Sequence, residues 1–154
     1  MKGVIRFFAT LGPCGHAPFA PATVGSAAIA LIGWFIPPPA LPITLTLLAV
    51  ATALAIWIAG EAEQAFGHDG GPIVVDEAIG QSIALLFVPH SLVAFAVAFF
   101  LFRVFDVWKP LGAREIQKLP GGYGVVADDI IAGLTACGAF HAGAWFARSR
   151  GWLH

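Results

Sequence analysis

Charged residues are scarce in this chain. Of its 154 residues, 11% are charged and 58% are hydrophobic, and the mean hydropathy is +0.84. Soluble globular domains contain about 25% charged and about 45–50% apolar residues. The composition therefore predicts an integral membrane protein. The formal net charge of −1 gives no electrostatic attraction to nucleic acid, and we expect no nucleic-acid partner.

Cysteine is also rare, and several phosphate-handling motifs are missing. Cys14 and Cys137 are not part of a Cys-x-x-Cys pair, so no disulfide framework is expected. Neither is followed by the arginine of a Cys-x5-Arg phosphatase loop. The sequence lacks a P-loop, an Asp-x-Asp phosphotransfer motif and the paired Asp-Gly/Ala-Arg pattern of CDP-alcohol phosphotransferases. Arg6 interrupts the apolar run that a cleavable signal peptide needs, so we expect insertion through the chain's own spans.

Long apolar runs are what the chain has in abundance. They cover about residues 24–36, 40–60, 73–105 and 125–147. A run of about 20 residues crosses the hydrocarbon core of a bilayer, and the second and fourth runs have that length. The third is too long for one span, and Pro89 should divide it into helices over 77–88 and 91–105. We predict one all-α domain over residues 1–154, a polytopic membrane bundle with about five membrane segments, some short or re-entrant.

The basic residues orient this bundle. They cluster near the N-terminus and between the last two segments: Lys2, Arg6, Arg103, Lys109, Arg114 and Lys118. The positive-inside rule assigns both regions to the cytoplasm. With five crossings, residues 1–23, 61–76 and 103–124 emerge on that same side. Arg148 and Arg150 would then lie outside, which leaves open a re-entrant last segment or an even number of spans.

Five of the nine carboxylates stand at the ends of the apolar runs: Asp76, Glu77, Asp106, Asp128 and Asp129. Ionised groups beside hydrocarbon are costly, so they bind a cation, pair with a base or carry protons. Adjacent carboxylates repel each other unless a positive charge lies between them. Mg²⁺ favours carboxylates together with a substrate phosphate. We therefore predict that the five acids converge at the cytoplasmic face and hold one or two Mg²⁺ ions.

Each acidic motif also has a simpler explanation. Asp76 and Glu77 would stabilise a helix N-terminus through the helix dipole, and only one of two adjacent helical residues can point squarely at a given ligand. Asp106 could pair with Lys109 one helical turn later, with Trp108 as an ordinary interfacial anchor.

Glycine and hydroxyl residues accompany the acids. Gly121 and Gly122 belong to a glycine-rich turn that could present backbone N–H groups to a phosphate, although ordinary loop geometry explains many such turns. Gly80 would allow close approach of a neighbouring backbone or of substrate. Thr23 and Ser26 offer hydroxyls for substrate binding, or either one caps the first apolar helix.

Four segments in order carry a resemblance to a known family. They are Pro-x-x-Pro-x-Thr-x-Gly-Ser (18–26), Ile-Val-Val-Asp-Glu-x-x-Gly (73–80), Phe-Arg-Val-Phe-Asp-Val-Trp-Lys-Pro (102–110) and Gly-Gly-Tyr-Gly-Val-Val-Ala-Asp-Asp-Ile-Ile-Ala-Gly (121–133). These segments are spread over residues 18–133, and the chain resembles the phosphatidylglycerophosphatase A family over nearly its whole length.

The resemblance implies a small, multi-pass phosphatase of the bacterial inner membrane that depends on Mg²⁺. Such an enzyme removes the terminal phosphate of phosphatidylglycerophosphate and leaves phosphatidylglycerol, so its partners are this anionic lipid and the surrounding membrane lipids. The resemblance also implies that all five acids belong to the site, with Lys109 beside them. The oligomeric state stays open.

We expect metal-assisted hydrolysis in which Lys109, with Arg103 or Arg114, binds the phosphate oxygens. A remaining carboxylate would activate water, and a covalent aspartyl-phosphate is the alternative route. A competing hypothesis is a small ion- or proton-coupled transporter, which predicts acids near mid-span. The observed acids lie near segment ends instead. A non-catalytic assembly subunit would give no reason for two acid pairs.

Overall fold

The computed structural model describes residues 2–67, 70–109 and 113–152, without the side chains of residues 113 and 114. Its elements follow one another as α1 (Lys2–Ala9), η1 (Cys14–His16), α2 (Pro21–Phe35), α3 (Leu41–Phe66), α4 (Val75–Ala84), α5 (Leu92–Trp108), α6 (Ala113–Ile116) and α7 (Gly122–Ser149). The described residues contain no strand, so the predicted all-α class is confirmed.

Prolines separate the helices where the sequence indicates. The N-terminal segment is not one helix, because α1 and the short turn η1 end before α2 begins at Pro21. The proline run 37–39 lies between α2 and α3, and Pro89 lies between α4 and α5. Proline lacks the backbone N–H and clashes with the preceding turn, so a helix does not continue through these positions. The helix before Pro89 ends at Ala84, four residues short of the predicted 88, and α5 begins at Leu92, one residue after the predicted 91.

Two of the described helices, α3 with 26 residues and α7 with 28, are long and apolar enough to cross a membrane. The apolar helix α2 is shorter, and α4 has 10 residues. At about 1.5 Å per residue, α4 spans roughly 15 Å, about half the hydrocarbon core. The prediction of five membrane segments is therefore not confirmed.

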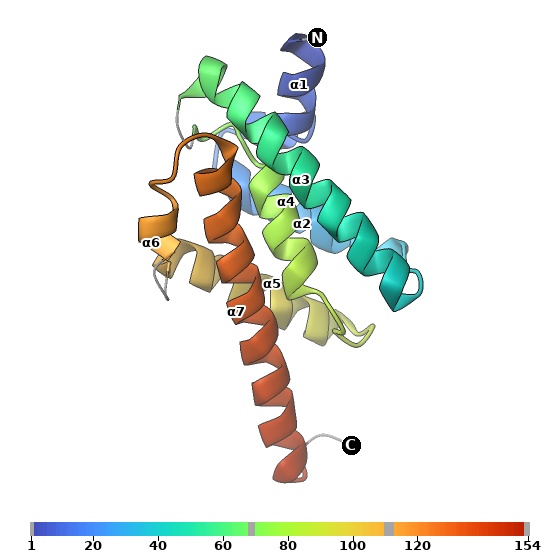
Figure 1. Cartoon of the computed structure of the whole chain (residues 1–154). Coiled ribbons are helices and arrows are strands. Elements are labelled where there is room, and N and C mark those ends of the chain that lie inside the picture. Colours follow the sequence, from blue (N-terminus) through green and yellow to red (C-terminus); the bar gives the residue numbers. More distant parts are fainter. Residues whose placement is uncertain (1, 68–69, 110–112, 153–154) are drawn as a thin grey trace.

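The helix α4 lies inside the protein. It contacts α2, α3, α5 and α7, and Figure 1 shows it between them. Nearly all of its side chains are buried, including Ile79 and Ile83. An apolar run in a sequence does not distinguish a segment buried in protein from one in lipid.

Glycines allow α4 and α7 to approach closely. A Cβ atom on Gly80 would lie 2.7 Å from the carbonyl oxygen of Asp129, and one on Gly133 would lie 2.4 Å from that of Gly80. Real Cβ atoms do not approach backbone atoms so closely. The expected close approach at Gly80 is thus confirmed, with the backbone of α7 as its neighbour.

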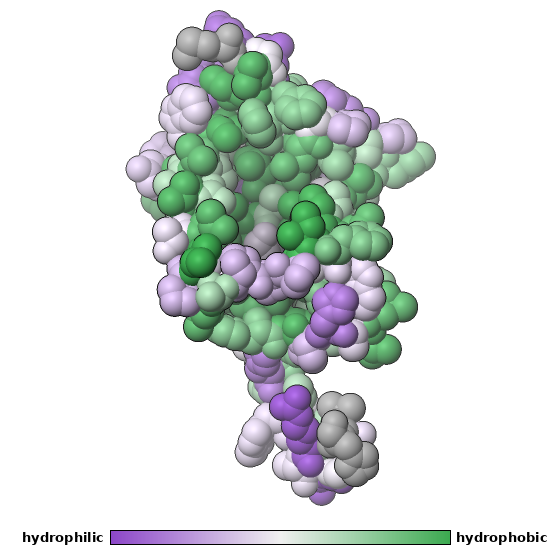
Figure 2. Space-filling view, turned by 90° about the vertical axis from the view of Figure 1, so that its right-hand side faces the viewer, coloured by the Kyte–Doolittle hydropathy of each residue, from purple (hydrophilic) through white to green (hydrophobic). Residues whose placement is uncertain are grey.

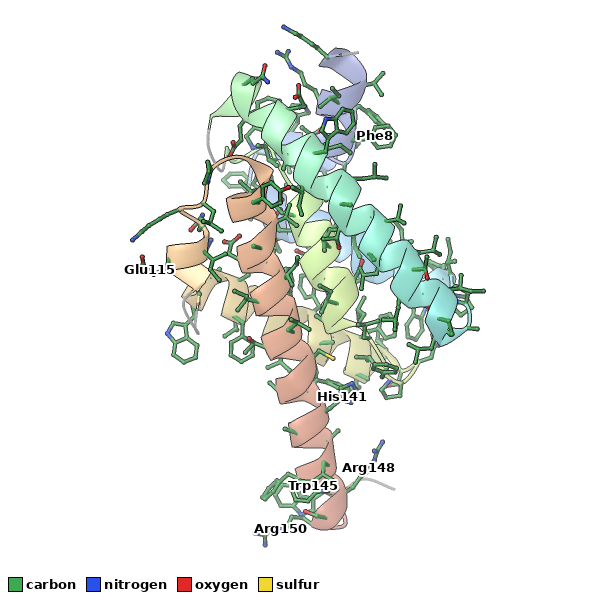
Figure 3. The ribbon with its side chains drawn as sticks, in the orientation of Figure 1. Phe8, Glu115, His141, Trp145, Arg148 and Arg150 are labelled. Atoms are coloured by element: carbon green, nitrogen blue, oxygen red, sulfur yellow. The ribbon has the colours of Figure 1, made fainter. Side chains whose placement is uncertain are left out.

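Large apolar side chains cover the outside of the bundle. Figure 2 shows broad hydrophobic regions on this face, a band of more polar atoms across it near mid-height, and polar atoms at the two ends. Leu47, Trp57 and Phe100 are among the exposed apolar residues. Soluble monomers rarely expose apolar patches of this extent, so the surface supports a membrane protein. The C-terminal part of α7 projects beyond the other helices, with Trp145, Arg148 and Arg150 at its tip (Figure 3).

Candidate active site

Five carboxylates from three helices meet at one place. Asp76 and Glu77 lie in the first turn of α4, Asp106 in the last turn of α5, and Asp128 and Asp129 about two turns into α7. Oxygen atoms of Asp76, Glu77 and Asp129 lie within 4.8 Å of one another. The same is true of Asp106, Asp128 and Asp129. Asp129 belongs to both groups and joins them into a single cluster.

The cluster lies in the protein interior. Asp76, Glu77, Asp128 and Asp129 are each at most 8% exposed, and the side chain of Asp106 is 13% exposed. Buried ionised carboxylates lose hydration and repel one another, which is costly without a compensating charge. Glu77 Oε2 and Asp129 Oδ2 are buried and lack a hydrogen-bond partner among the described residues. This donor set fits a bound cation.

Two basic side chains border the acids. Arg103 Nη1 lies 2.8 Å from Asp106 Oδ2, one helical turn along α5, and it donates to Ser26 Oγ of α2 at 3.3 Å. Lys109 follows the last residue of α5 and donates to Asp128 Oδ2 of α7. These pairs join α2, α5 and α7 around the cluster. They provide two positive charges against five carboxylates, which leaves the site electronegative.

The two hydroxyl residues lie within α2, and neither caps it. The N-cap position is occupied by Ala20, and no side chain caps the first turn. Ser26 is fully buried, donates to the carbonyl of Ala22 at 2.9 Å and accepts the bond from Arg103. Thr23 is half-buried one turn earlier. The N-cap alternative was therefore wrong, because α2 already begins at Pro21, before either hydroxyl.

The glycine turn before α7 has a packing role. A Cβ atom on Gly122 would lie 1.9 Å from the carbonyl oxygen of Ile56, so only glycine lets α7 start against α3. Gly121 has a positive φ of 64°, which glycine adopts without strain. Substrate contact by Gly121 and Gly122 stays a prediction. The side chain of Arg114 lies outside the described part of the chain.

Gln81 is a polar residue of the site region that the sequence analysis missed. It lies one turn after Glu77 on α4 and is fully buried. Its side-chain nitrogen and oxygen lack hydrogen-bond partners among the described residues. An unsatisfied buried amide is costly, which makes Gln81 a further candidate residue for the site. A glutamine four residues after a glutamate in an otherwise apolar helix was the available signal.

Comparison with known proteins gives one family. The family model described as phosphatidylglycerophosphatase A matches residues 7–144. A Bacteroides thetaiotaomicron protein named "Putative phosphatidylinositol-3-phosphatase" is 41% identical over 132 residues, covering 78% of this chain and 80% of that protein. Phosphatidylglycerophosphatase A of Escherichia coli is 35% identical over 132 residues, covering 82% and 76% of the two chains.

A Haemophilus influenzae protein, also named phosphatidylglycerophosphatase A, is 42% identical over 71 residues, 45% of this chain and 44% of that protein. No solved structure matches the chain. The family match covers all four segments on which the resemblance rested, and the transporter hypothesis is not favoured. The chain therefore belongs to the phosphatidylglycerophosphatase A family and is a phosphatase.

Proposed function

We propose that this protein hydrolyses the terminal phosphomonoester of phosphatidylglycerophosphate to give phosphatidylglycerol, with Mg²⁺, at the cytoplasmic face of a bacterial inner membrane. The observation that supports this most is that two clusters of three carboxylates share Asp129. Buried oxygen ligands next to basic side chains suit a hard divalent cation and a phosphate together. The family match and the names of two relatives support the choice of lipid.

The chemistry of the donors determines what the cluster would hold. All five side chains offer carboxylate oxygens, the ligands that Mg²⁺ prefers. Asp76, Glu77 and Asp129 would hold one ion, and Asp106, Asp128 and Asp129 would hold a second where two are bound. A bound cation would neutralise the phosphate charge and act as a Lewis acid on a phosphoryl oxygen.

The basic residues would bind the phosphate. Lys109 and Arg103 each pair with a carboxylate at the edge of the cluster. A phosphate bound there would lie beside both basic side chains. Arg103 can present two parallel N–H groups to phosphate oxygens, whereas Lys109 acts as a point charge. Ser26 orients the guanidinium of Arg103 through its hydroxyl.

Where only the first ion is bound, Asp106 or Asp128 would be left to accept the proton of the attacking water. The water oxygen then bonds to phosphorus as the bond from phosphorus to the glycerol oxygen breaks. The leaving alkoxide takes a proton, and inorganic phosphate and the lipid alcohol are released. Attack by an aspartate, followed by hydrolysis of the acyl phosphate, is the alternative route. The acyl chains stay in the bilayer throughout.

A phosphoinositide is the second candidate substrate. It is favoured by the 41% identity to the Bacteroides protein, whose name gives phosphatidylinositol 3-phosphate as substrate. Both lipids carry a phosphomonoester on a diacyl anchor, and they differ in the alcohol between the two. The five acids would serve either lipid, so the residues that contact the alcohol decide between them.

Phosphate release by the detergent-purified protein tests the proposal. We expect hydrolysis of phosphatidylglycerophosphate in Mg²⁺, loss of activity in EDTA, and recovery when Mg²⁺ is restored. Phosphatidylinositol 3-phosphate should be a poorer substrate, by at least tenfold in kcat/KM. A preference for the inositol lipid would replace the proposed substrate, and full activity in EDTA would rule out the metal.

A further inference from the structure

An apolar groove runs between α2 and α5. Its volume is about 360 Å³, and all of its lining side chains are aliphatic or aromatic, among them Ala27, Leu31 and Trp34 of α2 and Ala96, Phe99 and Phe100 of α5. Sites that bind small organic ligands have volumes of roughly 300–1,000 Å³ and apolar walls. We call this feature the α2–α5 groove.

The groove leads to the acid cluster along α5. Ala96 and Phe99 line the groove, Arg103 follows Phe99 by four residues, and Asp106 follows Arg103 by three. Residues at these spacings lie on one face of a helix. One face of α5 therefore changes from apolar to charged where the groove ends at Arg103.

The opposite wall, on α2, has the same order. Trp34 and Leu31 lie deep along the groove, Ala27 lies one turn closer to the acids, and Thr23 follows at the same spacing. Ser26, beside Ala27, accepts the hydrogen bond from Arg103 of the facing helix. This bond joins the two walls at the polar end of the groove. A molecule with an apolar tail and an anionic head would place its tail in the groove and its head at Arg103.

The length of the groove fits one hydrocarbon chain. From Ala27 to Phe35, the first and last lining residues on this helix, α2 advances by eight residues, or about 12 Å at about 1.5 Å per residue. One leaflet of the hydrocarbon core is about 15 Å thick, half of the usual ~30 Å. The groove thus runs about as far as an acyl chain extends below its headgroup.

Aromatic rings occupy the far end of the groove. The ring of Trp34 stacks on His90 with centroids 4.2 Å apart, and Phe95 contacts Trp34 edge-on at 5.4 Å. His90 also contacts the backbone carbonyl of Trp34 through Nε2 at 2.8 Å. These contacts hold the Trp34 ring in place at the far end of the groove.

We propose that the α2–α5 groove holds one acyl chain of the lipid substrate and so places the headgroup at Arg103 and the acid cluster. The inference rests on the proposed function, because it assumes a diacyl lipid phosphate. It goes further because it assigns a path for the acyl chain and names the residues that select a lipid over soluble phosphate esters. The groove residues bind the tail, and the residues of the acid cluster act on the phosphate.

The test fills the groove with a large ring. Ala27→Trp and Ala96→Trp place an indole between α2 and α5, and Ala53→Trp, on an exposed position of α3 that does not line this groove, is the matched control. The substrates are phosphatidylglycerophosphate in mixed micelles and its deacylated, water-soluble form. For each groove variant, the ratio of kcat/KM for lipid to that for the soluble ester should fall at least tenfold. Ala53→Trp should leave this ratio unchanged.

A binding measurement separates this inference from the function itself. Phosphatidylglycerol with a photoreactive acyl chain is irradiated with the protein, and the labelled peptides are identified by mass spectrometry. Labelling should concentrate on α2 and α5, and Ala96→Trp should reduce it at least fivefold. Uniform labelling around the bundle, as expected for surrounding lipid, would overturn the inference even if the enzyme is active. Inactivity of the wild type with labelling confined to the groove would overturn only the proposed reaction. An unchanged substrate ratio in both groove variants would also overturn the inference.

Discussion

Gly80 of α4 and Gly133 of α7 touch through their backbones, so closely that a Cβ atom on Gly133 would lie 2.4 Å from the carbonyl oxygen of Gly80. Glu77 lies one turn before Gly80, and Asp129 lies one turn before Gly133. The contact between the two glycines therefore fixes the distance between the two acids. Close helix packing at this point assembles the carboxylate cluster.

Enlarging either glycine should separate the acids. Gly133→Ala forces α4 and α7 apart, with an expected loss of about 1–3 kcal/mol of stability for overpacking. The rate of phosphate release should fall by more than the loss of stability explains, because the separated carboxylates no longer bind a cation together. Gly138→Ala, on the same helix with open space at its Cβ position, is the control. Thermal unfolding in detergent and phosphate release measure the two effects. Equal behaviour of the two variants would contradict the packing role.

Neutralising Asp129 should change stability in opposite directions with and without metal. Without Mg²⁺, Asp129→Asn removes one charge from a buried group of carboxylates, so the unfolding temperature should rise. With Mg²⁺ in excess, the wild type should gain stability from binding, and the variant should gain little. A Mg²⁺ titration of the unfolding temperature checks both signs. Identical stabilisation of both proteins would place the metal elsewhere.

The contribution of Arg103 to lipid binding should depend on the shape of its guanidinium as well as on its charge. Arg103→Lys keeps the positive charge but loses the planar guanidinium, whose Nη1 contacts both Asp106 and Ser26. We expect KM for the lipid to rise at least fivefold. Ser26→Ala removes one hydrogen bond, worth about 0.5–1.5 kcal/mol, and should have a smaller effect in the same direction. Steady-state kinetics of the two variants show which substitution raises KM more. A normal KM in Arg103→Lys would exclude a phosphate contact at Arg103.

The membrane orientation can be tested with reporters. Fusions after Gly70 and after Pro120 probe the connections that precede α4 and α7, whose first turns carry acids of the cluster. Because the acids share one site, both reporters should respond as cytoplasmic. A reporter after Arg150 should respond from the opposite side, since α7 is long enough to cross the membrane. Opposite responses at Gly70 and Pro120 would contradict a single site.

The sequence was informative wherever a residue type restricts the backbone or the charge. Pro89 marked the end of a helix, and the runs of paired acids marked the positions that meet in the structure. The count of five membrane segments is not confirmed, because two of the described helices are long and apolar enough to span and α4 is buried inside the bundle. Hydropathy alone does not carry that distinction.

Tertiary contacts account for what the sequence did not reveal. The bond between Arg103 and Ser26 joins residues 77 positions apart, and no local pattern indicates it. Gly122 is required by the backbone of α3, which a turn motif does not show. Gln81 became notable only once its burial and unsatisfied amide were known.

The central claim is that the carboxylates around Asp129 carry out phosphate hydrolysis. Its most direct test is the rate of phosphate release from phosphatidylglycerophosphate by Asp129→Asn in Mg²⁺, with Glu115→Gln as the control. Glu115 pairs with Lys118 on the exposed surface, where loss of the pair has little consequence. Mutating the outer-shell partners of a metal ligand already costs about 10–100-fold. Because Asp129 would itself be a ligand, we predict a loss of at least about 100-fold in Asp129→Asn and normal activity in Glu115→Gln. Wild-type rates from Asp129→Asn would contradict the claim.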